Sequence, residues 1–156
     1  MKKVFALLAV SALLLTGCGE KEMSASPDNL PTVTTNQGEA PTIGAPAGNP
    51  PTTLVTKDII VGSGAEALRT STMTVHYTLM TWSNGQLIES SWNGGSPATF
   101  PLANVIVGWQ QGIPGMKVGG RRLLVIPPDL GYGAQGGGPI GPNETLIFVV
   151  DAIGVA

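Results

Sequence analysis

Side chains that could do covalent chemistry or bind a metal are scarce in this sequence. Among 156 residues there is one histidine, His76, and one cysteine, Cys18. A Cys/His metal cluster or a Cys–His pair for nucleophilic catalysis therefore cannot be assembled in the body of the chain, and we expect neither a metal nor a cofactor. The glycine-rich run 133–141 follows a Tyr-Gly turn instead of a junction between a strand and a helix, so it is a weak candidate for phosphate binding.

The acidic residues do not indicate acid–base catalysis either. The spacing typical of paired catalytic carboxylates is missing from Glu89, Asp129, Glu144 and Asp151. His76 falls on the polar side of an alternating segment, which favours a hydrogen-bonded, structural role over a catalytic one.

The stretch VIVGWQQGIPGM, residues 105–116, is the most unusual part of the chain. It sets Trp109 among branched aliphatic residues and glycines, with no charged side chain until Lys117. This composition indicates an apolar concavity with few polar groups, in which any chemistry would depend on shape and desolvation.

The overall charge excludes one large class of partners. The formal net charge is -2 and only 12% of the residues are charged, so no basic surface is available for nucleic acid. A hydrophobic content of 42% nevertheless indicates that part of the chain folds around a core.

The first residues are typical of an export signal. Lys2 and Lys3 precede the apolar run VFALLAVSALLL, which is short for a membrane span but suits the hydrophobic region of a signal peptide. Residues 15–18, LTGC, resemble a bacterial lipobox, which implies cleavage after residue 17 and lipidation of Cys18. A bacterial protein so modified would be extracytoplasmic and anchored to a membrane of the cell envelope. The alternative is an ordinary signal peptide, in which Cys18 is incidental or removed.

Residues 18–52 predict a disordered linker. They are rich in Pro, Ser, Thr, Asn, Gly and Ala and contain no aromatic residue, so they offer little apolar area to offset the loss of chain entropy. Prolines would keep such a segment extended, and it would hold the folded part off the membrane. A binding role is the less favoured alternative.

Residues 53–156 have a common size for one domain, and their periodicity indicates mainly strands. Alternation from Thr72 to Leu79 predicts a half-buried strand. Apolar runs rich in branched residues predict central strands at 121–126 and 145–150, the second ended by Asp151. Shorter strands are expected near 59–61, 87–89 and 98–100. One short helix should begin near Val107, end by Pro114-Gly115, and lie across the concave face of the sheet.

Three segments in order carry a recognisable pattern. VHYTLM at 75–80, VIVGWQQGIPGMKVGGRR at 105–122 and IPPDLGYGAQGGGPIGPNETLIFVV at 126–150 together resemble the FKBP-type peptidyl-prolyl isomerases. The resemblance covers most of residues 70–155. It implies an α+β fold, in which a curved antiparallel sheet wraps around one short helix, and a pocket that binds an X-Pro dipeptide.

The resemblance also implies the floor and the walls of that pocket. Trp109 would form the floor on which the proline ring rests. Tyr77, Ile88 and Phe148 would line the walls.

The rim of the pocket follows in the same way. Val105 and Ile106 would flank the substrate, with the backbone N–H of Ile106 available to a substrate carbonyl. The Tyr132 hydroxyl would bind the same or the neighbouring carbonyl, and Ile140 would pack from the flap. Glu89 takes a position where the family usually has aspartate. The residues implied to act in catalysis are Tyr77, Glu89, Trp109, Tyr132 and Phe148.

Several positions depart from the family pattern. Ile88 replaces a usual phenylalanine, and Ala98, two residues before Phe100, stands where another aromatic residue commonly sits. The flap between Tyr132 and Phe148 is one residue shorter than in common relatives. The replacements at Ile88 and Ala98 imply a wider pocket.

The function implied is prolyl isomerisation in protein folding outside the cytoplasm. Expected partners are proline-containing polypeptides and rapamycin-like macrolides, and the expected state is a monomer. The alternative is a module that grips proline-containing segments, as a chaperone or scaffold, with little catalysis; the lost aromatics at Ile88 and Ala98 favour it. A third possibility is a surface protein with a vestigial pocket.

Some residues lie outside the family motifs. Trp82 and Trp92 are expected to be packing residues or an extra contact surface. Arg121 and Arg122 are expected to solvate a strand edge or to pair with a carboxylate.

Overall fold

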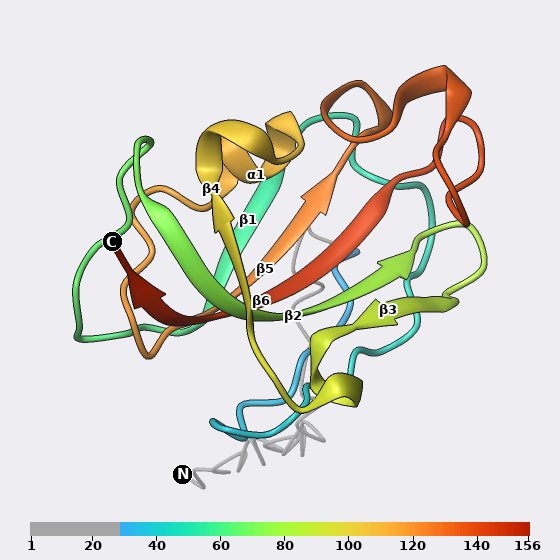
Figure 1. Cartoon of the computed structure of the whole chain (residues 1–156). Coiled ribbons are helices and arrows are strands. Elements are labelled where there is room, and N and C mark those ends of the chain that lie inside the picture. The colour runs from blue at the N-terminus through green and yellow to red at the C-terminus, as the bar shows by residue number, and fades with distance from the viewer. Residues whose placement is uncertain (1–28) are drawn as a thin grey trace, which may run out of the picture.

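The computed structural model describes residues 29–156, so the predicted signal peptide and Cys18 lie outside it. The described chain forms a six-stranded antiparallel sheet in the order β1-β5-β6-β2-β3, with β4 paired to β2 (Figure 1). The strands are β1 (Val55–Ile60), β2 (Thr72–Thr81), β3 (Leu87–Ser90), β4 (Ala98–Pro101), β5 (Arg121–Ile126) and β6 (Leu146–Val155). One α-helix, α1 (Val107–Gly112), crosses the concave face, as expected from the sequence. The 3-10 turns are η1 (Ser91–Gly94), η2 (Leu102–Asn104), η3 (Pro128–Leu130) and η4 (Gly133–Gln135).

The two central strands are buried on both faces, which explains their continuous apolar sequences. In β5, Leu124 and Ile126 face the core beneath the helix, whereas Leu123 and Val125 face a second core on the other side of the sheet. Strand β6 alternates in the same way and continues to Val155, so the expectation that it ends at Asp151 was wrong. Asp151 does not end the strand because its carboxylate is paired within the fold.

The helix lies close to the sheet because two glycines face it. A Cβ atom at Gly108 would come within 2.5 Å of the Ile126 side chain, and one at Gly112 would come within 2.6 Å of Leu124. Both glycines therefore permit a backbone approach that no other residue allows. This approach fixes the height of Trp109 above the sheet.

Strand β2 pairs with two short strands at one edge of the sheet. Its first half pairs with β4, through Thr72–Val75, and its second half pairs with β3, through Thr78–Met80. The chain crosses between β3 and β4 through η1, where Trp92 stacks on His76 at a centroid distance of 3.9 Å. The Nδ1 atom of His76 lies 2.9 Å from Ser91 Oγ, so this histidine has the structural role expected.

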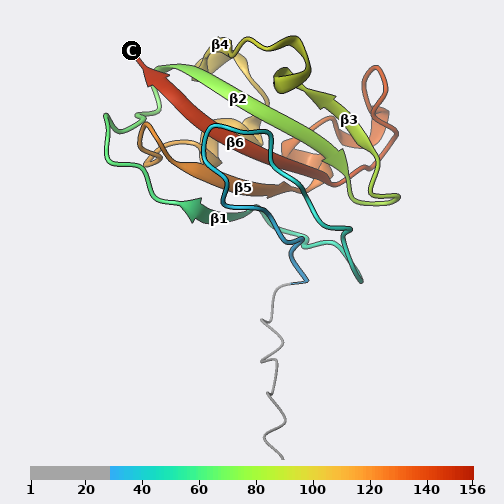
Figure 2. The same ribbon diagram turned by 90° about the horizontal axis from the view of Figure 1, so that it is seen from below.

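Residues 29–52 are not a disordered linker, which corrects the prediction for this part of 18–52. They run across the outer face of the sheet, opposite the helix (Figure 2). Leu30, Val33 and Ile43 pack against the outer core, whose buried members are Met80, Trp82, Leu123, Val125, Ile147 and Val149. We call residues 29–52 the strap. A few aliphatic residues are enough to hold the strap in place, because the sheet supplies the rest of the apolar surface that is buried.

A buried arginine fastens the strap to the sheet. Arg121 is fully buried, and its Nε donates to Asp151 Oδ1 at 2.7 Å. Its terminal nitrogens donate to the backbone carbonyls of Thr34, at 2.9 Å, and Glu39, at 2.6 Å. The expectation of a carboxylate partner is thus confirmed for Arg121, whereas a solvated strand edge is wrong for it. Trp82 packs here too, and its Nε1 donates to the Gly48 carbonyl at 3.2 Å.

Within residues 29–156, no helix is both long enough and apolar enough to cross a membrane.

Candidate functional site

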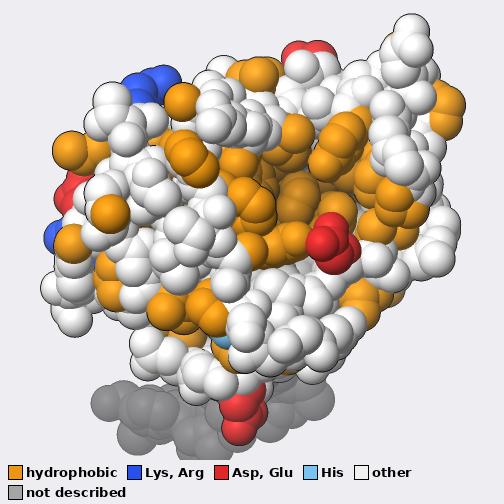
Figure 3. Space-filling view, viewed as in Figure 1, with side chains coloured by type: hydrophobic (Ala, Val, Ile, Leu, Met, Phe, Trp, Pro, Cys, Tyr) orange, Lys and Arg blue, Asp and Glu red, His pale blue; other side chains and the backbone are white. Residues whose placement is uncertain are grey.

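A cavity of about 290 Å³ opens on the concave face between the sheet, the start of α1 and the loop that carries Tyr132. Figure 3 shows it as a hollow lined mainly by hydrophobic side chains, with an acidic side chain at its edge. The residues that line it are Tyr77, Leu79, Glu89, Phe100, Asn104, Val105, Ile106, Trp109, Tyr132 and Phe148. They come from β2, β3, β4, β6, the segment from η2 into α1, and the loop between η3 and η4.

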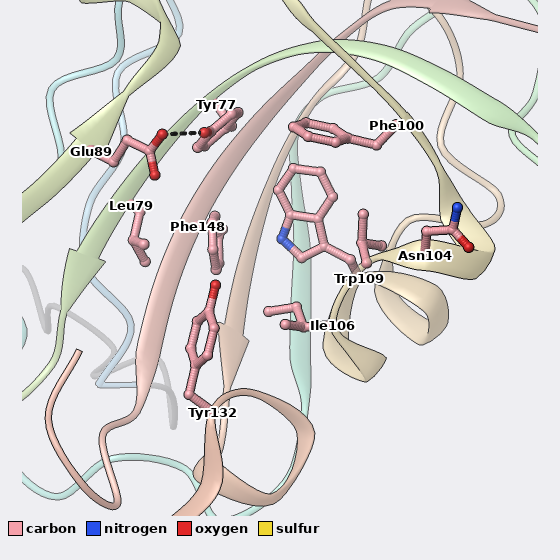
Figure 4. Close-up of a pocket in the computed structure, with 10 residues that line it drawn as sticks. Tyr77, Leu79, Glu89, Phe100, Asn104, Ile106, Trp109, Tyr132 and Phe148 are labelled. Atoms are coloured by element: carbon pink, nitrogen blue, oxygen red, sulfur yellow. Dashed lines mark hydrogen bonds between the residues drawn. The ribbon is translucent and has the colours of Figure 1, made fainter. Parts of the chain in front are cut away.

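The floor of the cavity is the indole of Trp109, with 4% of the residue exposed. Three aromatic rings surround it edge to face, with centroid distances of 5.7 Å to Tyr77, 5.9 Å to Phe100 and 5.3 Å to Phe148 (Figure 4). Edge-to-face contacts of this kind are favourable and hold each ring at a fixed angle. These contacts fix the orientation of the indole at the floor of the cavity.

One wall carries a hydrogen-bonded pair of polar groups. The Tyr77 hydroxyl donates to Glu89 Oε1 at 2.6 Å, from β2 to the neighbouring β3 (Figure 4). Burial raises the pKa of the Tyr77 hydroxyl well above its ordinary range, and the hydrogen bond and the charge of Glu89 raise it further. The hydroxyl therefore stays protonated and keeps donating to the carboxylate near neutral pH.

The start of α1 presents an unused backbone donor. The Ile106 carbonyl accepts from the N–H groups of Trp109 and Gln110, and the Gln110 side chain donates to the Val105 carbonyl at 2.8 Å. No acceptor within residues 29–156 is assigned to the Ile106 N–H. The first N–H groups of a helix have no partner inside the helix, so this donor can serve a bound carbonyl.

Tyr132 forms the outer lip of the cavity. The residue is 41% exposed, and its hydroxyl has no partner in the described part of the chain. Gly137 packs on the ring, where a Cβ atom would come within 3.0 Å of Cδ1. Its backbone also exchanges two hydrogen bonds with Ile140, which closes this part of the loop in a tight turn.

Most residues that the sequence predicted for the site do line this cavity. They are Tyr77, Glu89, Val105, Ile106, Trp109, Tyr132 and Phe148. Two predicted residues are not among the lining residues. Ile88 packs partly buried against the inner core, and Ile140 is buried in that core with 6% exposure.

Ala98 brings no aromatic ring to the site, but Phe100, two residues later on the same strand, does. The ring of Phe100 lines the cavity and contacts Trp109. Alternation along β4 puts Ala98 and Phe100 on the same side of the strand, so the aromatic ring on this side belongs to Phe100 and not to residue 98. Phe100 therefore adds an aromatic wall that the sequence analysis did not assign to the site.

Leu79 and Asn104 also line the cavity, although the sequence did not single them out. The alternation that placed Tyr77 on the inner face predicts the same face for Leu79. Asn104 lies in η2, where no periodic signal could have placed it.

No cluster of three or more potential metal ligands occurs in the part of the chain that the structure describes. The cavity has a single charged lining residue, Glu89, which alone is a poor metal site.

Comparisons with known proteins agree with this geometry. Residues 64–153, more than half of the chain, match the family model for FKBP-type peptidyl-prolyl cis-trans isomerases. The chain is 49% identical over 115 residues to a Corynebacterium glutamicum protein named "Probable FK506-binding protein", covering 74% of this chain and 98% of that protein. It is 42% identical over 106 residues to the "Outer membrane protein MIP" of Legionella longbeachae, covering 67% of this chain and 45% of that protein.

A solved structure is similar as well. The crystal structure of FkpA from Escherichia coli matches with a TM-score of 0.62 and 37% identity, over 65% of this chain and 47% of that one. The expected α+β fold, with a curved antiparallel sheet around one short helix, is confirmed. The chain thus belongs to the family of FKBP-type peptidyl-prolyl cis-trans isomerases, enzymes that accelerate rotation about X-Pro bonds.

Proposed function

We propose that the cavity over Trp109 is the site of isomerisation and that the protein works outside the cytoplasm from a lipid anchor at Cys18. The observation that supports the site best is the combination of an open apolar hollow beside a fixed indole with two unused donors, the Ile106 N–H and the Tyr132 hydroxyl.

Rotation about an X-Pro bond is slow because resonance gives the C–N bond partial double-bond character, with a barrier of about 18–20 kcal/mol. Water stabilises the planar amide by hydrogen bonding to its polarised carbonyl oxygen. An apolar cavity removes that water, and rigid walls can fit the twisted amide better than either planar form. A millionfold acceleration needs about 8 kcal/mol, which desolvation, shape and one or two hydrogen bonds can share.

The lining residues divide this work. Trp109 supports the proline ring, with Tyr77 and Phe148 as walls. The Ile106 N–H and the Tyr132 hydroxyl hold substrate carbonyls in place. Glu89 acts through its hydrogen bond to Tyr77, which fixes the position of that ring.

Two more predicted residues support these walls from outside the cavity. Ile88 and Ile140 pack in or against the inner core, behind the lining residues. We assign them to maintaining the shape of the pocket, together with Val105 at the rim.

The proposed ligands follow from the family. They are proline-containing polypeptides and macrolides such as FK506 and rapamycin, consistent with the name of the Corynebacterium relative. The proposed working unit is a monomer.

The proposed location depends on the N-terminal sequence. The LTGC segment at 15–18 would direct cleavage before Cys18 and lipidation of its thiol. The resemblance to a protein named outer membrane protein MIP supports a place in the cell envelope. Isomerisation there would relieve slow proline steps in exported proteins, which last tens of seconds or more.

An assay that couples isomerisation to proteolysis of a short X-Pro peptide tests the site. Trp109→Leu should lower kcat/KM at least about tenfold, and Tyr132→Phe should lower it about threefold through loss of one hydrogen bond. Trp92→Leu, at the stacked tryptophan outside the cavity, is the matched control and should keep wild-type activity. Circular dichroism checks that each variant is folded. Equal activity losses in Trp92→Leu and Trp109→Leu would contradict the assignment.

A further inference from the structure

The cavity has one uncompensated charge. Glu89 is the only ionisable acid or base among its lining residues apart from the two tyrosines. The lysines and arginines of residues 29–156 all lie elsewhere; they are Lys57, Arg69, Lys117, Arg121 and Arg122. Arg121 and Arg122 are already paired, with Asp151 and Asp58. In Figure 3 the basic side chains in view are away from the hollow.

Half of the Glu89 carboxylate is free. Oε1 accepts the Tyr77 hydroxyl at 2.6 Å, and no residue of the described chain donates to Oε2. Figure 4 shows the second oxygen pointing away from Tyr77, on the side of Leu79 and Phe148. The Tyr77 bond restricts rotation of the carboxylate and so fixes the direction in which the second oxygen faces.

We propose that Glu89 selects substrates, so that a lysine or arginine bonded directly to the proline is preferred over a neutral or acidic residue. The inference rests on the proposed placement of the proline ring over Trp109. A cavity of about 290 Å³ holds little more than that ring and its flanking amides, so the neighbouring side chains must leave across the rim. A lysine or arginine stem can lie along the apolar wall while its charged end reaches the carboxylate.

The expected preference is modest. Glu89 is exposed, and ion pairs at such positions correspond to about a threefold difference in binding. Salt screens such pairs, so the preference should fall as ionic strength rises. Asn104, which lines the cavity from η2, is neutral and neither adds to this effect nor opposes it.

NMR exchange spectroscopy on matched peptides tests the proposal without a coupling protease. The peptides carry lysine, norleucine or glutamate immediately before the proline, and a second set varies the residue immediately after it. We expect kcat/KM to follow the order lysine, norleucine, glutamate in at least one set, with about a threefold ratio of lysine to norleucine.

Three variants identify the cause. Glu89→Gln keeps an acceptor for the Tyr77 hydroxyl and removes the charge, so the ratio should fall to about one whatever happens to overall activity. Glu89→Asp keeps the charge and should keep a ratio above one. Asp129→Asn removes a charge from an exposed residue of η3 outside the cavity and should leave the ratio unchanged.

The outcomes separate the two proposals. A ratio of one in the wild type, or a ratio that persists in Glu89→Gln, would overturn the selection by Glu89 while leaving the isomerase site intact. If Glu89→Gln does not fold, the ratio in the wild type must still drop between about 0.05 M and about 0.5 M salt, or the proposal is wrong. Absence of exchange with every peptide would overturn the proposed site itself, and the selection with it.

Discussion

At the scale of single residues, the site depends on where polar atoms are placed in an apolar hollow. Tyr77 shows this best, because its hydroxyl is both a wall of the cavity and the anchor of Glu89. Its raised pKa follows from burial first and from Glu89 second. Burial and the hydrogen bond to Glu89 keep the hydroxyl protonated, and they also hold the Tyr77 ring in place as a wall of the cavity.

A spectroscopic titration checks this assignment. The chain has two tyrosines, Tyr77 and Tyr132, so tyrosinate absorbance can be divided between them. Part of the wild-type absorbance change should occur clearly above pH 10, and Tyr77→Phe should lack that part. Because an unfolded tyrosine ionises near pH 10, stability that is full below that pH should fall as the pH rises further. Identical high-pH curves for wild type and Tyr77→Phe would show that the hydroxyl is not protected.

The sequence predicted some of the residues that line the cavity and missed others, for physical reasons. Trp109 and Tyr132 stand in ordered motifs with turn and glycine signals, so the family motifs predicted their positions in the pocket. Phe100 was overlooked because period-2 alternation lets a strand deliver a ring at either of two positions on one face. Asn104 had no signal, since a short 3-10 turn has no periodicity to read.

At the scale of elements, the strap is the main difference between expectation and structure. Composition alone predicted a linker because residues 29–52 contain too little apolar area to fold by themselves. The structure adds what composition cannot show, namely a sheet face and a buried guanidinium that accept the segment. Arg121 binds backbone carbonyls of the strap. Because every residue has a backbone carbonyl, the strap sequence carries no signal for this contact.

The two ion pairs of β5 provide a comparison of buried and exposed arrangements. Arg121 and Asp151 have side-chain exposures of 0% and 8%, whereas Arg122 and Asp58 have 12% and 42%. Arg121→Met should lower the free energy of unfolding by about 3 kcal/mol, because it leaves the Asp151 carboxylate buried without a partner. Asp58→Asn, in the exposed pair, should cost less than about 1 kcal/mol. Urea denaturation measures both changes.

The stability of Arg121→Met should depend on pH in a predictable direction. Burial raises the pKa of Asp151 above its ordinary value even though Arg121 lowers it, so the ionised carboxylate is a net cost in the folded state. Removing Arg121 increases that cost. The deficit of Arg121→Met should therefore shrink as the pH falls from 7 through the raised pKa toward the ordinary range. A loss of unfolding free energy that grows on acidification would contradict this account. Limited proteolysis should also cut the strap faster in Arg121→Met than in the wild type.

At the scale of the whole molecule, the strap and the cavity lie on opposite faces of the sheet (Figures 1 and 2). Leu30 packs in the outer core, so the chain enters the folded part from the side away from the cavity. Ten residues, 19 to 28, separate Cys18 from the first described residue. Fully extended, they span at most about 35 Å, so the strap shortens the tether that the sequence suggested.

This arrangement predicts that an anchor at Cys18 leaves the cavity open to solvent. Cys18 is the only cysteine, so a maleimide lipid can couple the purified chain to vesicles at that position. The kcat/KM for a short X-Pro peptide should stay within about twofold of the free protein, because the pocket would face away from the bilayer. The control is Cys18→Ser combined with Val107→Cys, since Val107 is 43% exposed at the start of α1 beside the cavity. Attachment there should reduce activity strongly by pressing the hollow against the lipid. A loss of tenfold or more with the Cys18 anchor would mean that the tether holds the cavity toward the membrane, contrary to the placement of the strap.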